Sequence, residues 1–118
     1  PLPANPEVHR ALLAYMSDLD FMSTSMLPHG PLTADANGER TVQGASLDHA
    51  IWFHRPFRAD EWLLFAKESP NAGGARGFVR GHFFNRAGEM VATAAQECLI
   101  RPVGAARAAL EAAQPSAT

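Results

Sequence analysis

Four strand-like runs joined by short breaks fill residues 41–101, and they constrain the fold more than any other feature of this chain. The runs cover residues 41–54, 61–68, 75–85 and 90–101. The first run is interpreted as one strand with a bend at Gly44, and turn-forming residues occupy the links at 69–74 and 86–88. Short links between successive strands are typical of antiparallel pairing. The sequence therefore predicts a four-stranded antiparallel meander.

A helix is predicted before these strands. Asn5 suits an N-cap, Pro6 suits the first helical position, and apolar residues then recur at helical spacing at Val8, Leu12, Met16 and Leu19. The helix is expected to end near 17–19. Residues 20–40 contain several Pro and Gly residues and are predicted to be a loop, and a loop of this length usually covers a functional site.

One helix and one sheet predict a two-layer α+β domain. The strands are apolar on both faces, with Ile51 on one side and Trp52 on the other, although one helix layer covers only one face. We therefore expect a partner on the second face. The Ala-rich tail, 103–118, is interpreted as either disordered or a short helix over 105–113.

Composition excludes several classes of protein. The chain has 118 residues, enough for one domain, and its net charge of −2 gives no broad attraction to nucleic acid. No apolar stretch approaches the roughly 18 residues that span a bilayer, so we expect no membrane insertion. Cys98 is the single cysteine, which excludes an internal disulfide, and no secretory signal is apparent. These features favour a cytoplasmic location.

Two acids, Asp18 and Asp20, stand at the predicted end of the helix. One interpretation is a pair of solvated acids at a polar helix exit. The other is a general base that takes a proton from water. The spacing alone leaves both open.

A catalytic triad is not supported by Ser46, Asp48 and His49. Side chains alternate along a strand, so Ser46 and Asp48 share a face and His49 is expected on the opposite one. His49 and His54 are also expected on opposite faces, and no Cys pair assists them, so we predict no metal site. One of these histidines is expected to be a hydrogen-bonded core or interface residue.

Gln96 lies in a small, apolar stretch and, if buried, needs hydrogen-bond partners. It is interpreted either as a structural amide or as one that orients a water or a carbonyl. Cys98 is expected to be a core residue, because no obvious cation activates it. Arg76 and Arg80 form either a phosphate-binding stripe or, as we favour, a solvated face.

Several segments together resemble the C-terminal half of the acyl-CoA thioesterase II family. They span roughly residues 8–102: LLAY at 12–15, SDL at 17–19, PHG at 28–30, DHAIWFHRPF at 48–57, EWLL at 61–64, ARGFVRG at 75–81 and QE at 96–97. The resemblance implies a hotdog fold, in which an antiparallel sheet wraps around a long central helix. It assigns residues 1–102 to a C-terminal hotdog domain whose first strand is expected upstream of this chain.

The resemblance also implies a function and a site. It implies hydrolysis of fatty acyl-CoA, without a cofactor or a covalent enzyme intermediate, by a water that Asp18 activates with Ser46 and Gln96. A backbone N–H is expected to stabilise the oxyanion. Pairing with an N-terminal hotdog half, or self-association, is expected to complete the sheet. A non-catalytic acyl-CoA-binding or scaffold subunit is the alternative, and a hotdog hydratase is disfavoured because its Asp/His motif is not seen.

Overall fold

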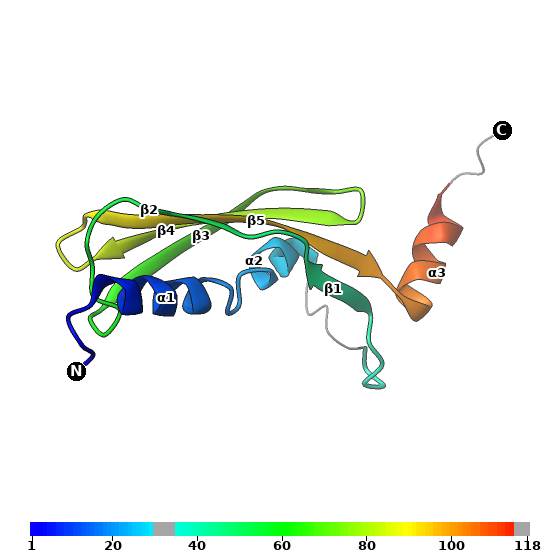
Figure 1. Ribbon diagram of the computed structural model, residues 1–118. Helices are drawn as coiled ribbons and strands as arrows, with labels where there is room; N and C mark the ends of the chain where they lie inside the picture. Colours follow the sequence, from blue (N-terminus) through cyan, green and yellow to red (C-terminus); the bar gives the residue numbers. More distant parts are fainter. Residues whose placement is uncertain (30–34, 115–118) are drawn as a thin grey trace.

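The computed structural model describes residues 1–29 and 35–114, and it shows an antiparallel sheet with the two N-terminal helices on one face (Figure 1). The elements are helix α1 (Pro6–Ser17), helix α2 (Ser23–Met26), a 3-10 turn (Leu27–His29), strands β1 (Val42–Ser46), β2 (Ala50–Phe53), β3 (Leu63–Gly73), β4 (Arg76–Asn85) and β5 (Met90–Pro102), and helix α3 (Gly104–Ala113). The predicted α+β class is confirmed. None of the helices within the described residues has the length and apolar character needed to cross a lipid bilayer.

The sheet is a meander only in its second half. Strands β3, β4 and β5 follow one another as antiparallel neighbours, but β1 and β2 both pair with β5 rather than with β3. The predicted four-stranded meander is therefore wrong at its first step. The link at 54–62 carries the chain from β2 at one side of β5 to β3 at the far side of β4.

The first predicted strand, 41–54, is broken in two. The break lies at residues 47–49 rather than at Gly44. Ser46 pairs with Cys98 and Ala50 pairs with Ala95, so four steps along this segment match only three along β5. The extra residue is a bulge, and it shifts the alternation of side chains by one position.

Strand β3 extends through most of the segment predicted to be a turn. It reaches Gly73 because the pairing with β4 resumes at Asn71 after an irregularity that follows Glu68. Pro70 falls inside this irregularity, where its missing N–H removes no ladder bond. The actual reversal occurs at Gly74 and Ala75, both of which have positive φ angles.

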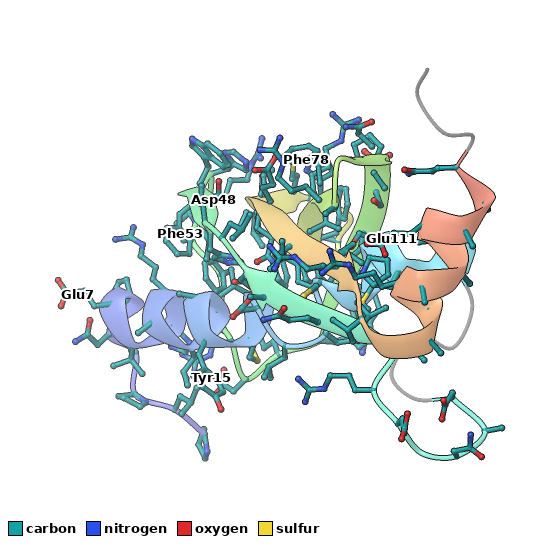
Figure 2. The ribbon with its side chains drawn as sticks, turned by 90° about the vertical axis from the view of Figure 1, so that its right-hand side faces the viewer. Glu7, Tyr15, Asp48, Phe53, Phe78 and Glu111 are labelled. Atoms are coloured by element: carbon teal, nitrogen blue, oxygen red, sulfur yellow. The ribbon has the colours of Figure 1, made fainter. Side chains whose placement is uncertain are left out.

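Helix α1 follows the sequence prediction closely. The Asn5 side chain caps it by accepting a hydrogen bond from the Glu7 N–H, and the helix ends at Ser17. Its buried residues, His9, Leu13 and Ser17, lie on the side toward the sheet, whereas Tyr15 points away from the sheet into solvent (Figure 2).

The predicted loop at 20–40 is wrong in part, because α2 and the 3-10 turn occupy 23–29. Helix α2 packs very close to the sheet: a Cβ atom at Gly77 would lie 2.6 Å from the Ser25 Cβ. Glycine at this position of β4 therefore permits the short helix to cover the sheet. Residues 30–34 of the predicted loop lie outside the described residues.

The core fills the space between the helices and the sheet. Its fully buried members come from α1, the α1–α2 link and the inner faces of β4 and β5: Leu13, Phe21, Val79, Val91, Ala92, Ala94 and Cys98. The opposite face of the sheet carries no helix (Figure 1). It exposes Trp52, at 53% of its surface, together with Arg76 and Arg80, which pair with Glu97 and Glu68. The solvated-face interpretation of the two arginines agrees with these ion pairs.

Helix α3 contains no buried residue and extends beyond the end of β5 (Figure 1). Of the two interpretations of the tail, the structure has the helix, while residues 115–118 lie outside the described part. The boundary of the proposed hotdog domain at 102 stays a prediction.

Candidate functional site

Asp18, Ser46 and Gln96 come together where α1 ends against the sheet. Asp18 is the C-cap residue of α1, Ser46 is the last residue of β1, and Gln96 lies in the middle of β5. The Ser46 hydroxyl donates to Asp18 Oδ1 at 3.4 Å, and Gln96 Nε2 donates to Ser46 Oγ at 3.2 Å. The three polar groups therefore form one hydrogen-bonded chain from a buried amide to a carboxylate.

The two ends of this chain differ in exposure. Gln96 is only 1% exposed, whereas the Asp18 side chain keeps 55% of its surface accessible. A shallow depression of about 380 Å³ is lined in part by His49, Phe78 and Gln96, but neither Asp18 nor Ser46 lines it. The exposure of Asp18 leaves its carboxylate accessible to a water or a substrate carbonyl, while the buried amide is fixed in the protein.

His49 lies in the same cluster, which corrects the prediction that it faces the opposite side. Its Nδ1 is 2.6 Å from Gln96 Oε1 and 3.9 Å from Asp18 Oδ1. Its Nε2 is 2.8 Å from Ser17 Oγ, and the Phe21 ring meets the imidazole edge-on at 5.8 Å. Because of the bulge at 47–49, Ser46 and His49 point to the same face.

One feature of the sequence bears on the face that His49 occupies. A strand-like run over residues 41–54 is longer than most strands, so a break within it was to be expected. The position of the break depends on the hydrogen bond that Asp48 accepts. Asp48 Oδ1 accepts the backbone N–H of Glu97 at 2.7 Å, which satisfies a donor on β5 where the ladder is interrupted. Asp48 is thus engaged with the backbone of β5 rather than with His49, which agrees with the rejection of a Ser–Asp–His triad.

Asp20 is turned away from the cluster. It has a positive φ of 60°, accepts a hydrogen bond from Ser23 and pairs with Lys67 Nζ at 3.4 Å. The Ser23 hydroxyl, followed by the charge of Lys67, lowers the pKa of this carboxyl. Asp20 is therefore a stabilised anion, and Asp18 is the acid that contacts Ser46.

Cys98 is fully buried and accepts a hydrogen bond from Gln96 Nε2 at 3.0 Å. Burial raises the pKa of this thiol, which keeps it protonated near neutral pH. It therefore has the character of a core residue rather than of a nucleophile, as the sequence predicted.

Two other histidines lie elsewhere. His54 and His82 both contact the Thr93 hydroxyl, at 2.8 and 3.0 Å, on the other face of the sheet. His54 and His49 therefore have separate partners. Within the described residues, no group of three or more His, Cys, Asp or Glu side chains is arranged to hold a metal ion.

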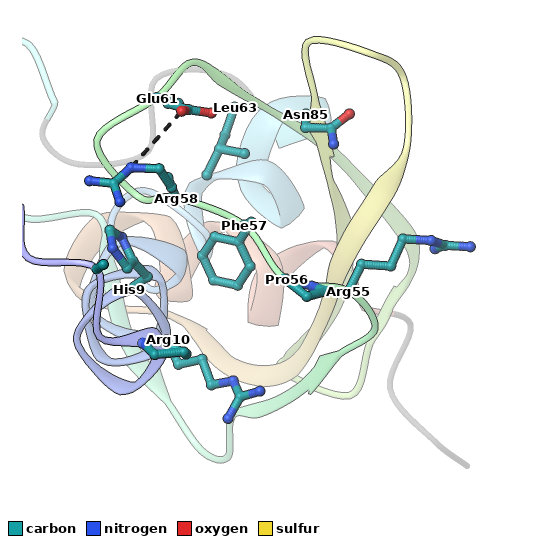
Figure 3. A pocket seen from close by; sticks show the side chains of 11 residues that line it. His9, Arg10, Arg55, Pro56, Phe57, Arg58, Glu61, Leu63 and Asn85 are labelled. Carbon is teal, nitrogen blue, oxygen red and sulfur yellow. Dashed lines mark ion pairs between the residues drawn. The ribbon is translucent and has the colours of Figure 1, made fainter.

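A second hollow, of about 460 Å³, lies at the opposite end of α1 (Figure 3). Phe57 lies at its centre, with His9, Arg10 and Arg58 on one side and Arg55 on the other. Arg58 pairs with Asp60 at 2.8 Å and lowers the pKa of that carboxyl. Helix α1 has 12 residues, which is about 18 Å of length at 1.5 Å per residue, so this hollow is separate from Asp18.

The sequence matches a known protein family over most of its length. A family model described as acyl-CoA thioesterase matches residues 1–99. The chain is 45% identical over 95 residues to acyl-coenzyme A thioesterase 8 of Mus musculus, and the matched region covers 80% of this chain and 28% of that protein. It is 42% identical over 101 residues to acyl-CoA thioesterase 2 of Haemophilus influenzae, covering 84% of this chain and 33% of that protein.

A solved structure supports the same likeness. The acyl-CoA thioesterase II TesB2 from Mycobacterium marinum superposes with a TM-score of 0.79 at 45% identity, over 88% of this chain and 38% of that chain. A probable thioesterase from Bartonella henselae, at 21% identity, shares the fold with a TM-score of 0.54 over 76% of this chain and 81% of that one. The hotdog fold is thus shown. The chain spans about a third or less of the length of the curated relatives it matches.

Proposed function

The chain belongs to the acyl-CoA thioesterase family, and from this premise we propose that it hydrolyses fatty acyl-CoA to a free fatty acid and coenzyme A. The observation that carries the proposal is the hydrogen-bonded chain from Gln96 through Ser46 to the half-exposed Asp18. An accessible carboxylate next to two fixed polar groups is suited to general base catalysis on water. The relatives that match are named as acyl-CoA thioesterases, which supports the same chemistry.

The proposed reaction uses one water and no covalent enzyme intermediate. Ser46 and Gln96 hold the water, Asp18 accepts its proton, and the water oxygen attacks the thioester carbonyl carbon. The tetrahedral intermediate then collapses with cleavage of the C–S bond, and the coenzyme A thiolate leaves with the proton that Asp18 had accepted from the water. A backbone N–H is proposed to stabilise the oxyanion, because such donors supply a large part of the barrier reduction in acyl transfer.

A binding-only role is the second candidate. The depression beside His49 and Gln96 is shallow, and the chain covers only 28% of the mouse relative. A site whose walls come partly from another hotdog half fits these observations. In the alternative, this chain holds acyl-CoA or supports an assembly while hydrolysis occurs elsewhere.

Pairing with a second hotdog unit is part of the proposal. The sheet face opposite the helices exposes apolar side chains, including Trp52 and Leu64. An N-terminal half or a second copy would cover such a face or extend the sheet at its edge. A cytoplasmic location and a role in fatty-acid metabolism stay predictions.

The experiment that separates the two candidates follows thiol release from a series of acyl-CoA esters by the full-length protein. A thiol reagent reports coenzyme A with little background from Cys98, because that side chain is fully buried. We expect thiol release that saturates with acyl-CoA concentration. Saturable acyl-CoA binding without any thiol release would instead support the binding-only role.

A further inference from the structure

We propose that His49 is a positioning residue that fixes the amide of Gln96 in the orientation that the hydrolytic site needs. The inference deepens the proposed function and rests on it for its kinetic test. It starts from the shortest contact in the cluster, the 2.6 Å separation between His49 Nδ1 and Gln96 Oε1.

Hydrogen-bond accounting assigns a proton to Nδ1. An amide oxygen can only accept hydrogen bonds, so the ring nitrogen that faces Gln96 Oε1 must donate. The amide nitrogen of Gln96 then faces the other way, where it donates to Ser46 Oγ at 3.2 Å and to Cys98 Sγ at 3.0 Å. The proton on His49 Nδ1 thus determines which end of the amide faces Ser46.

The other ring nitrogen is held by Ser17. The Ser17 hydroxyl has one proton and two acceptors at 2.8 Å, the carbonyl of Ala14 and His49 Nε2. If the proton goes to Nε2, the ring is neutral. If it goes to Ala14, Nε2 donates to Ser17 Oγ and the ring is a cation facing Asp18 Oδ1 at 3.9 Å. In both states Nδ1 keeps its proton, so the contact with Gln96 survives a change in the charge of the ring.

The reverse orientation of the amide would impair the proposed chemistry. With Gln96 Oε1 facing Ser46, the single hydroxyl proton of Ser46 would be drawn toward the amide and away from Asp18. The surroundings restrict such a turn, because Gln96 and Ser17 are almost completely buried and Phe21 packs against the edge of the imidazole. His49 therefore acts on the reaction only through the geometry of Gln96.

Two substitutions of His49 distinguish this role from simple packing. The amide nitrogen of an Asn side chain stands about where Nδ1 stands, and that of a Gln side chain stands about where Nε2 stands. We expect His49→Asn to keep the donor to Gln96 and to retain most of the wild-type kcat. We expect His49→Gln to lower kcat at least about tenfold with little change in KM, because a misplaced catalytic group costs turnover rather than ground-state binding.

His54→Asn, on the other face of the sheet, is expected to leave kcat unchanged. Equal kcat values for His49→Gln and the wild type, in a wild type that releases thiol, would overturn the inference while leaving the proposed function intact. Absence of thiol release by the wild type would instead count against the proposed function.

A measurement on the unmodified full-length protein does not depend on activity or on variant folding. The ¹⁵N chemical shifts of the His49 imidazole report which ring nitrogens carry protons. We expect a protonated Nδ1, in the neutral or in the cationic ring. A neutral ring with its proton on Nε2 and a bare Nδ1 would overturn the inference.

Discussion

Replacing Asp18 by asparagine is expected to lower the kcat for acyl-CoA hydrolysis by about 10²–10⁴-fold, the usual contribution of a general base. The amide keeps the shape of the carboxylate and an oxygen that can accept from Ser46, but it cannot take a proton from water. The loss therefore falls on the chemical step, and binding of acyl-CoA is expected to persist. Thiol release under saturating acyl-CoA measures the effect.

Asp20 provides a matched control for this substitution. It lies two residues away and is engaged with Ser23 and Lys67 rather than with Ser46. Asparagine tolerates the positive φ at this position, so Asp20→Asn is expected to fold normally and to keep kcat close to that of the wild type. Turnover near the wild-type value in Asp18→Asn would show that Asp18 is not the base.

Replacing Phe21 by alanine is expected to lower the free energy of unfolding by about 3–5 kcal/mol, the cost of removing a large aromatic side chain from a core. Phe21 is fully buried, and its ring lies 5.2 Å from that of Phe65 and 5.8 Å from that of His49. The substitution removes the ring that meets His49 edge-on as well as a part of the core. Urea denaturation followed by circular dichroism measures the change.

Tyr15 supplies the comparison for the stability measurement. Its side chain is 70% exposed on the outer surface of α1, so Tyr15→Ala is expected to change the unfolding free energy by no more than about 0.5 kcal/mol. A Phe21→Ala protein as stable as Tyr15→Ala would contradict the packing of the α1–α2 link against the sheet.

Local signals predicted the helix and the last strands well. Asn5 and Pro6 mark the start of α1 through capping and fixed φ, which depend only on neighbouring residues. The β4–β5 reversal was predicted equally well, because Gly88 supplies the positive φ that a tight turn requires. Such features need no knowledge of distant contacts.

Features that depend on distant pairing were predicted poorly. Strands β1 and β2 pair with β5, and β3 extends to Gly73. Both results come from contacts between strands that local propensity does not record. Helix α2 is short, and it can lie against the sheet because Gly77 leaves a flat surface there. No periodicity within residues 20–40 reveals that surface.

The site was predicted through family resemblance rather than through spacing. Asp18, Ser46 and Gln96 come from three separate elements, and the spacing of these residues in the sequence gives no reason to join them. His49 was assigned to the wrong face because one extra residue in a strand reverses every later side chain. The position of that extra residue is defined by the pairing of β1 and β2 with β5.

The most direct test of the central claim is a crystal structure of full-length Asp18→Asn protein with an uncleaved acyl-CoA. The account predicts a water within hydrogen-bonding distance of Ser46 and Gln96, about 3–3.5 Å from the thioester carbonyl carbon. A thioester bound in another part of the molecule, with no water between it and these two side chains, would contradict the account.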